Sequence, residues 1–261
     1  MVVQGPPGVG KTFIAKRIAF ALMGRQDHRR VQMVQFHQSY AYEDFIQGWR
    51  PAGNGFALRN GVFYSFCRRA EADRADRPYV FIIDEINRGN LSKVFGELMM
   101  LIEADKRGRE FEIPLTYSSS ESDRFSVPEN VYIIGLMNTA DRSLAMVDYA
   151  LRRRFGFVTL KPAFDNPRFR EWLATRGADP TLVALIIDRV NTLNGAILKD
   201  DKNLGAGFEI GHSFFCPQGT EVSLDERWFR EVIDAEIAPL LREYCFDDPK
   251  KAEQWINQLL P

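Results

Sequence analysis

The chain has 261 residues, enough for one large domain or two smaller ones, and its apolar fraction of 45% and charged fraction of 26% are ordinary for a soluble globular protein. A formal net charge of −1 argues against a chain that binds nucleic acid over its whole surface, but it is compatible with a local basic patch. No apolar run reaches the roughly 18 residues that a membrane span needs, and no signal peptide is recognisable, so we expect a cytoplasmic protein without membrane contact.

The cysteines and histidines do not indicate a metal centre. The three cysteines are scattered and lie outside any C-x-x-C pattern: Cys67, Cys216 and Cys245. The three histidines have no ligand spacing of the H-E-x-x-H kind: His28, His37 and His212. We therefore expect a reduced cytosolic setting and no zinc site.

The clearest motif lies at residues 5–12, directly after a short apolar run at residues 2–3. Its residues fit G-x-x-x-x-G-K-[ST], the phosphate-binding P-loop: Gly5, Pro6, Pro7, Gly8, Val9, Gly10, Lys11 and Thr12. The glycines let successive N–H groups turn toward an anion, Lys11 reaches the β- and γ-phosphates, and the Thr12 hydroxyl ligates Mg²⁺. The chain is therefore predicted to bind a nucleoside triphosphate. We also expect a fragment of a longer protein, because a strand this central normally follows a segment that covers the base.

Helices and strands alternate along the next 60 residues. The spacing of apolar residues predicts a helix over residues 13–22, with the positive end of its dipole aimed at the phosphates. A strand is predicted at residues 31–36, and a short helix starts at residue 42. Four glycines and a proline predict a loop or hairpin over residues 48–61, and a helix is predicted over residues 62–72.

A second anchor lies at residues 79–85. Five consecutive apolar residues after Pro78 predict a strand buried on both faces, as in a parallel sheet, and this strand ends at Asp84 and Glu85. Beside a P-loop, the first carboxylate can hold the Mg²⁺ shell and the second can orient or deprotonate the attacking water. The alternative is a pair of solvated acids at a strand end, which the neighbouring P-loop disfavours.

The following stretch combines a helix with an irregular insertion. A polar turn at residues 87–90 leads into an amphipathic helix predicted over residues 91–103. Two short alternating pieces, residues 111–117 and 124–127, predict a hairpin insertion. In a ring-forming motor such a hairpin can face the central pore, and a plain surface excursion explains it equally well.

Another buried strand is predicted at residues 131–137, and it ends at Asn138. If this strand lies between the P-loop strand and the Asp-Glu strand, Asn138 faces the γ-phosphate and the attacking water. A short helix predicted from about residue 145 leads into Arg152-Arg153-Arg154, and a strand follows at residues 157–160. The arginines could act as fingers on a neighbouring subunit's nucleotide, worth on the order of 10³–10⁵ in rate in other P-loop enzymes. A basic surface turn is the alternative.

Two domains are predicted. Alternating strands and helices over residues 1–161 indicate an α/β fold, a P-loop domain with αβα layers and a mainly parallel sheet. Residues 162–261 are predicted to form a small helical lid. Its helices are expected at residues 166–176, 181–198, 226–244 and 249–260, with a glycine-rich segment at residues 204–215.

The phosphate loop, the Asp84-Glu85 strand, Asn138 and the arginine run, in this order, resemble an AAA+ ATPase or GTPase module. The finer resemblance is to the McrB-type GTPase subunits of McrBC modification-dependent restriction systems. It is carried by the segment at residues 84–97 that begins Asp-Glu-Ile-Asn-Arg, by Met-Asn-Thr-Ala-Asp-Arg-Ser at 137–143, and by residues 148–155, 210–215 and 238–241. The resemblance covers essentially the whole chain.

This resemblance implies a ring-forming, hexameric motor that places nucleotide at its subunit interfaces, prefers GTP to ATP and uses Mg²⁺. It implies a McrC-like nuclease partner that stimulates hydrolysis, so that DNA cleavage resides in the partner. DNA carrying 5-methylcytosine would be recognised by a separate N-terminal domain, and this chain would meet DNA only through the assembled complex.

The resemblance also implies roles for single residues. Lys11 and Thr12 match the phosphate and Mg²⁺ ligands, and Asp84 matches the residue that holds the metal shell. Glu85 matches the residue that handles the water, and Asn138 matches the sensor asparagine.

Further matches concern the subunit interface and the lid. Asp141 and Arg142 fall in a segment that the family uses near the interface, and Arg153 and Arg154 are the best finger candidates. His212 either touches the nucleotide or packs within the lid. The Asn-Thr-Ala-Asp string resembles the guanine-reading N-K-x-D motif, but a sensor asparagine at the phosphate end lies too far from the base. Guanine selection therefore has no residue assigned to it.

Two other functions fit the same motifs. An ATP-driven remodelling factor of the MoxR kind would act on protein complexes, and base preference would distinguish it from a restriction motor. A nucleotide-dependent scaffold without hydrolysis is disfavoured, because Lys11, Asp84, Glu85, Asn138 and the arginine run are all present.

Overall fold

The computed structural model describes residues 1–261 apart from residues 119–122, 142–151, 218, 220–221 and 261. The chain divides into two compact units. The first unit contains Met1–Gln4, Thr12–Met137 and Asp141–Val158. The second unit contains Gly5–Lys11, Asn138–Ala140 and Thr159–Pro261. Most of the P-loop therefore groups with the C-terminal residues, and the predicted domain division at residue 161 stays a prediction.

A five-stranded sheet forms the centre of the α/β fold. Its strands, in spatial order, are β2 (Val31–Gln35), β5 (Tyr79–Asp84), β8 (Val131–Asn138), β1 (Val2–Gly5) and β9 (Phe157–Thr159). The pairs β2–β5 and β5–β8 are parallel. The strand that ends at Asn138 thus lies between the P-loop strand and the Asp-Glu strand, which is the condition that the sequence analysis set for a role of Asn138 at the γ-phosphate.

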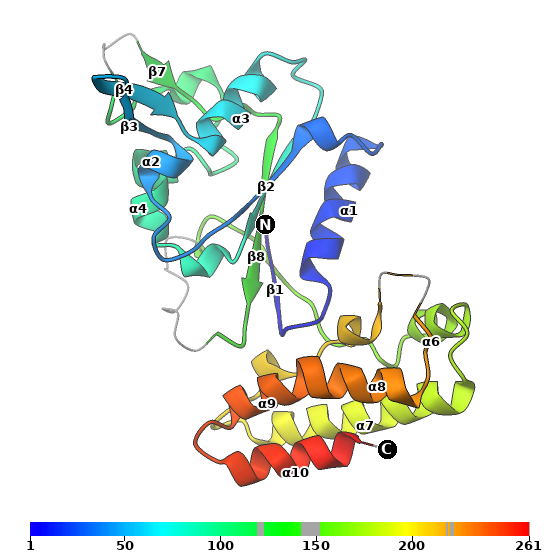
Figure 1. Cartoon of the computed structure of the whole chain (residues 1–261). Helices are drawn as coiled ribbons and strands as arrows, with labels where there is room; N and C mark the ends of the chain where they lie inside the picture. The colour runs from blue at the N-terminus through cyan, green and yellow to red at the C-terminus, as the bar shows by residue number, and fades with distance from the viewer. Residues whose placement is uncertain (119–122, 142–151, 218, 220–221, 261) are drawn as a thin grey trace. The chain divides into compact units, whose positions relative to one another are not determined.

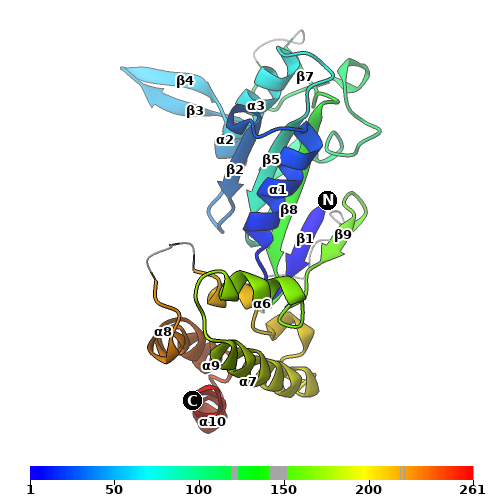
Figure 2. The same cartoon turned by 90° about the vertical axis from the view of Figure 1, so that its right-hand side faces the viewer.

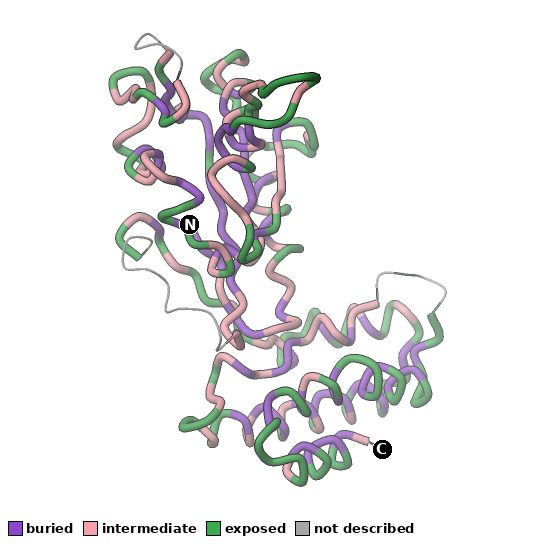
Figure 3. Tube along the Cα trace, turned by 60° about the vertical axis from the view of Figure 1, so that its left-hand side comes forward, coloured by how far each residue is buried: buried purple, intermediate pink, exposed green. Residues whose placement is uncertain are grey.

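Helices lie on both sides of this sheet. In Figure 1, α1 (Lys11–Met23) lies on one side of the strands. On the other side lie α2 (Tyr42–Phe45), α3 (Val62–Glu71) and α4 (Leu91–Phe95). Strands β1, β5 and β8 are buried along most of their length, and buried backbone is purple in Figure 3, whereas β2 and β9 are only partly buried or exposed. A cluster of aromatic rings fills this second side, with Phe45 and Phe63 stacked at 4.8 Å between ring centroids. The layered α/β prediction is therefore confirmed.

The prediction of a helix over residues 91–103 is correct for residues 91–95 and wrong for the rest. Helix α4 ends at Phe95, and a 3₁₀ turn, Gly96–Met99, follows. Gly96 has a φ of 52°, a left-handed conformation that interrupts an α-helix. The amphipathic spacing continues through this break, so periodicity alone does not reveal it.

Two antiparallel hairpins extend from the first unit. Strands β3 (Gln47–Ala52) and β4 (Gly55–Asn60) form the first, which projects clearly in Figure 2. Strands β6 (Ile113–Pro114) and β7 (Arg124–Phe125) form the second. The first decides between the loop and the hairpin that the sequence left open for residues 48–61, and the second confirms the predicted hairpin insertion. The short helix predicted from residue 145 lies outside the described residues.

The second unit is mainly helical. Its helices are α6 (Pro167–Ala174), α7 (Pro180–Lys199), α8 (Glu226–Val232), α9 (Ala238–Tyr244) and α10 (Pro249–Leu259). Asn166, Asp179, Asp225 and Asp248 cap four of these helices by accepting a backbone N–H with the side chain. The glycine-rich segment contains two 3₁₀ turns, Ala206–Phe208 and His212–Phe215.

Two details of these helices differ from the sequence analysis. The helix predicted over residues 226–244 is interrupted by a π-helical turn, Ile233–Ile237, because Pro239 cannot donate an N–H to the turn before it. Among the described residues, α7 is long and apolar enough to cross a membrane by length and composition, with a mean hydropathy of 1.3. Eight of its residues are buried in the core of the second unit, which is the behaviour of a core helix in a globular fold.

Candidate nucleotide-binding and hydrolysis site

The P-loop connects β1 to α1 and has the backbone shape that anion binding requires. Gly8 and Gly10 have φ values of 74° and 79°, which L-residues rarely adopt. The Lys11 ammonium donates hydrogen bonds to the carbonyl oxygens of Gly5 and Pro6, both at 2.9 Å. Pro6 and Pro7 have no N–H group. The amides that this loop offers to phosphate oxygens therefore begin at Gly8.

The backbone on either side of His212 donates hydrogen bonds to carbonyl groups of the P-loop. The Gly211 N–H donates to the Pro7 carbonyl at 2.9 Å, and the Ser213 N–H donates to the Gly8 carbonyl at 2.7 Å. Both partners belong to the second unit. The sequence analysis singled out His212 in this segment, but it is the two flanking amides that contact the loop.

The His212 side chain turns toward the start of α6. Its Nδ1 accepts the Ala163 N–H at 3.2 Å, and the rings of Phe164 and Phe169 lie edge-on to it. Burial lowers the pKa of His212 below its ordinary value of 6.5. These contacts give His212 a packing role, and nucleotide binding by this side chain stays a prediction.

Residues 138–141, here called the sensor segment, follow β8 and are hydrogen-bonded to the P-loop through Thr139. The Thr139 N–H donates to the Gly5 carbonyl at 3.2 Å, and the Thr139 hydroxyl donates to the Gly207 carbonyl at 3.0 Å. The side-chain oxygen of the preceding Asn138 accepts the Ala140 N–H at 3.3 Å. Asn138 therefore begins a turn whose backbone is fixed to the first residue of the loop.

The two carboxylates of the Asp-Glu strand have different backbone conformations. Asp84 is the last residue of β5, whereas Glu85 lies just beyond it with a φ of 51° and a ψ of 45°. The Glu85 N–H donates to the Asp84 carboxylate at 3.1 Å. Both side chains are half-buried. The left-handed conformation of Glu85 turns the chain sharply at the end of β5, so the Glu85 carboxylate does not continue the direction of the strand.

The oxygen donors present fit Mg²⁺. The Thr12 hydroxyl is exposed at the first turn of α1, and Asp84 offers a carboxylate at the carboxyl end of β5. Within the described part of the chain, no group of three or more His, Cys, Asp or Glu side chains forms a metal cage. Mg²⁺ is commonly held by one or two protein oxygens together with substrate phosphates and water, so this sparse donor set suits it.

Arg88 connects the Glu85 carboxylate to the sensor segment, a contact that the sequence analysis did not foresee. Its guanidinium lies 3.3 Å from Glu85 and donates to the Asp141 carboxylate at 2.8 Å and 3.1 Å. Hydrogen bonding to Asp141 raises the pKa of Arg88, against the opposing effect of desolvation. Arg88 belongs to a 3₁₀ turn, Ile86–Arg88, that reads only as a polar turn in the sequence. An arginine three residues after Glu85, the carboxylate predicted to handle the water, is the signal that could have pointed to this pairing.

The finger candidates have different surroundings. Arg154 pairs with Glu103 at 2.9 Å, and its side chain is only 22% exposed. Arg152 and Arg153 are exposed. Arg142 lies outside the described residues. Of the two arginines named as fingers, Arg153 is the one whose side chain is exposed to solvent.

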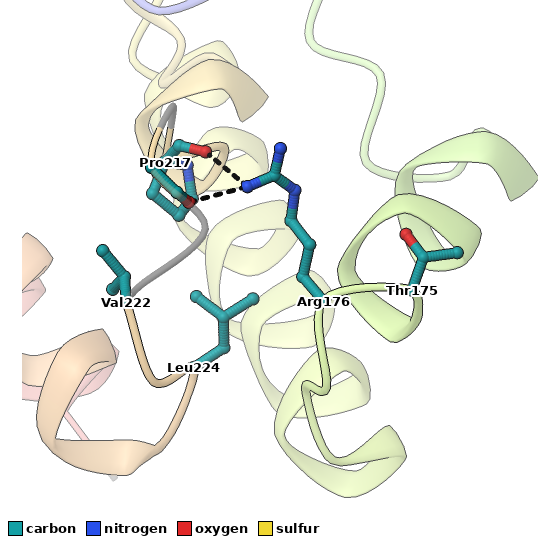
Figure 4. Close-up of a pocket in the computed structure, with 6 residues that line it drawn as sticks. Thr175, Arg176, Pro217, Val222 and Leu224 are labelled. Carbon is teal, nitrogen blue, oxygen red and sulfur yellow. Dashed lines mark hydrogen bonds between the residues drawn. The ribbon is translucent and has the colours of Figure 1, made fainter.

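Two of the cavities formed by described residues lie in the second unit. One, of about 290 Å³, is lined by the start of the P-loop and the segment after β9, together with Thr139, Ala206, Gly207 and Glu209. Burial raises the pKa of Glu209. The other, of about 240 Å³, lies where Arg176 donates to the carbonyls of Pro217 and Gly219 at 3.2 Å and 2.8 Å (Figure 4). The first of these two cavities is the one that borders the phosphate loop.

The chain resembles known proteins, and with one of them the resemblance covers its whole length. Residues 1–155 match the family described as AAA domain (dynein-related subfamily), and residues 185–253 match the family described as McrB, alpha-helical lid domain. The chain is 57% identical over 263 residues to the type IV methyl-directed restriction enzyme EcoKMcrB subunit of Escherichia coli (strain K12), which covers 100% of this chain and 57% of that protein. It is 25% identical over 196 residues to the type II restriction enzyme BsuMI component YdiS of Bacillus subtilis (strain 168), which covers 61% of this chain and 56% of that protein. The chain thus spans little more than half the length of these relatives.

Proposed function

Because the chain belongs to the AAA domain family, dynein-related subfamily, we propose that it is the nucleotide-hydrolysing motor subunit of a modification-dependent restriction system, with GTP as its preferred substrate. The observation that carries this proposal is the 57% identity to the E. coli McrB subunit over the whole chain, P-loop and lid included. The P-loop, the two carboxylates and the sensor segment are all present in the sequence, as hydrolysis requires.

The proposed mechanism assigns each residue a place around the phosphates. The P-loop amides and Lys11 hold the β- and γ-phosphates, and Thr12 and Asp84 hold Mg²⁺. The metal ion, when bound, neutralises charge on the phosphate oxygens. Glu85 orients and deprotonates the attacking water, and Asn138 holds that water in line.

The proposed active form is a hexameric ring. Arg153 of a neighbouring subunit neutralises the charge that develops on the γ-phosphate, and Arg154 does so only after it leaves Glu103. Asp141 and Arg142 are proposed to act near this interface, and Asp141 also pairs with Arg88. Movement of the lid, residues 162–261, against the α/β domain, residues 1–161, then transmits hydrolysis to the ring.

The proposed partner is a McrC-like nuclease that stimulates hydrolysis and cuts DNA. DNA bearing 5-methylcytosine is recognised by another domain of the system, and this subunit powers translocation. The proposed setting is the cytoplasm, in agreement with three cysteines that form no disulfide.

The test is steady-state hydrolysis of GTP and of ATP in parallel, with Mg²⁺, with and without the McrC-like protein. The Glu85→Gln protein provides the background rate. We expect turnover that is selective for GTP and rises with the partner. Turnover of ATP that does not respond to the partner would instead favour a MoxR-like remodelling factor, and the absence of turnover of either nucleotide would refute hydrolysis by this chain.

A further inference from the structure

We infer that residues 204–215, here called the strap, set the phosphate-binding conformation of the P-loop by holding its outward-facing carbonyl groups. We further infer that Asn194 of α7 is the positioning residue that holds the strap in place. The inference rests on the proposed function, because it concerns the same phosphate site. It adds a part that touches neither the phosphate nor the metal.

The first step is the direction of two peptide planes. Gly211 and Ser213 donate their N–H groups to the carbonyls of Pro7 and Gly8, at 2.9 Å and 2.7 Å. In a planar trans peptide the carbonyl and the following N–H point in opposite directions. Holding these two carbonyls toward the strap therefore turns the N–H groups of Gly8 and Val9 away from it. These are the first amides of the loop that can bind phosphate oxygens.

The second step is how closely the two backbones approach. A Cβ atom on Gly211 would lie 2.0 Å from the Gly8 carbonyl carbon. A Cβ atom on Gly8 would lie 2.3 Å from the ring of Phe214. The strap thus packs directly on the loop, and the contact leaves the two carbonyls little freedom to rotate.

The third step is what fixes the strap itself. Asn194 is 5% exposed, and its side chain makes two hydrogen bonds to Ile210, the residue just before Gly211. It donates to the Ile210 carbonyl at 3.0 Å and accepts the Ile210 N–H at 2.7 Å. A buried amide that completes both backbone bonds of one residue determines where that residue lies. The Thr139 hydroxyl holds the strap a second time, at Gly207.

The consequence is a preorganised anion site. If the strap is released, the P-loop must order its own amides when nucleotide binds, and the cost appears as weaker binding. We expect about a tenfold rise in Kd, equivalent to about 1.4 kcal/mol, which is the size of one or two backbone hydrogen bonds. Chemistry after binding should change little, so KM should rise with kcat nearly constant.

The experiment compares Asn194→Leu with Val190→Ala in the full chain. Leucine has nearly the shape of asparagine but can make neither bond to Ile210. Val190 is equally buried on the same helix, so its truncation controls for loss of core packing. The readouts are the affinity for mant-GDP by fluorescence titration, and KM and kcat for GTP.

A second pair of variants guards against failure of Asn194→Leu to fold. Thr139→Val removes the hydroxyl that donates to Gly207, whereas Thr139→Ser keeps it. We expect Asn194→Leu and Thr139→Val to raise the Kd for mant-GDP, and Val190→Ala and Thr139→Ser to leave it close to that of the wild type.

The outcomes are distinct. If the wild type binds mant-GDP and the strap variants bind no more weakly than their controls, the inference is overturned while the proposed function stands. A fall in kcat with KM unchanged would also overturn it, because the strap would then act on chemistry. If the wild type binds neither mant-GDP nor mant-ADP, the proposed function itself fails.

Discussion

Replacing Asp141 by alanine should slow hydrolysis much more than it destabilises the fold. The Asp141 carboxylate is the nearer of two acids that hold the Arg88 guanidinium, at 2.8 Å, and Glu85 is the other, at 3.3 Å. Without Asp141, Arg88 is restrained by Glu85 alone. The guanidinium can then draw the Glu85 carboxylate, which we propose handles the water, out of position.

The structure sets the size of both effects. The side chains of Arg88 and Asp141 are 42% and 23% exposed, so solvent screens their attraction, and the free energy of unfolding should fall by no more than about 1 kcal/mol. Misplacing a catalytic group by about 1 Å can cost about 100-fold in rate. We therefore expect kcat to fall about 10- to 100-fold, with little change in nucleotide affinity.

The assay is steady-state hydrolysis together with urea unfolding, and Asp76→Ala is the matched control. Asp76 pairs with Arg74 at 2.7 Å, a similar distance, but on an exposed turn away from Glu85. An Asp141→Ala protein with the kcat of the control would refute the reasoning. A double-mutant cycle with Arg88→Ala should show a coupling in the activation free energy, since both substitutions act on one network.

Three further predictions follow from the site. Glu85→Gln should keep nucleotide affinity in a binding titration and lower single-turnover hydrolysis by about 10²–10⁴-fold, the usual contribution of a general base. Because burial lowers the pKa of His212 below 6.5, the unfolded chain takes up a proton before the folded chain does as pH falls. The free energy of unfolding should then decrease below about pH 6.5, and urea titrations should show less of this decrease in His212→Asn. Arg153→Ala should lower ring-dependent hydrolysis more than Arg154→Ala, whereas Arg154→Ala should lower the melting temperature more because Glu103 loses one of its two cationic partners and keeps only Lys106.

Much of the fold was predictable because the strongest signals are local. A run of apolar residues that ends in Asp84 and Glu85 is typical of a buried strand with polar groups at its end, and the structure has such a strand there. The hairpin at β3 and β4 follows from glycines that permit its tight turn. The resemblance to McrB-type subunits, drawn from short motifs, is confirmed by the identity along the chain.

The parts that were not predictable depend on long-range contacts or on a single backbone angle. The break after Phe95 depends on the left-handed Gly96, and a helical pattern tolerates a glycine without showing its φ. Arg88 and Asp141 are 53 residues apart, so only the sheet order brings them together. Contacts made by backbone amides, such as those of Gly211 and Ser213, leave almost no trace in the side-chain sequence.

Glu85 is the only non-glycine residue with a positive φ in the part of the chain that the structure describes. Such a conformation costs an L-residue about 1–2 kcal/mol, a cost that glycine largely avoids. The proposed role of Glu85 therefore sets stability against hydrolysis at this position, because the residue that relaxes the backbone has no carboxylate. A library screened for thermal stability alone should enrich Glu85→Gly and, if the proposed role holds, accumulate inactive protein, so a search for more stable variants of this chain must select for turnover at every round.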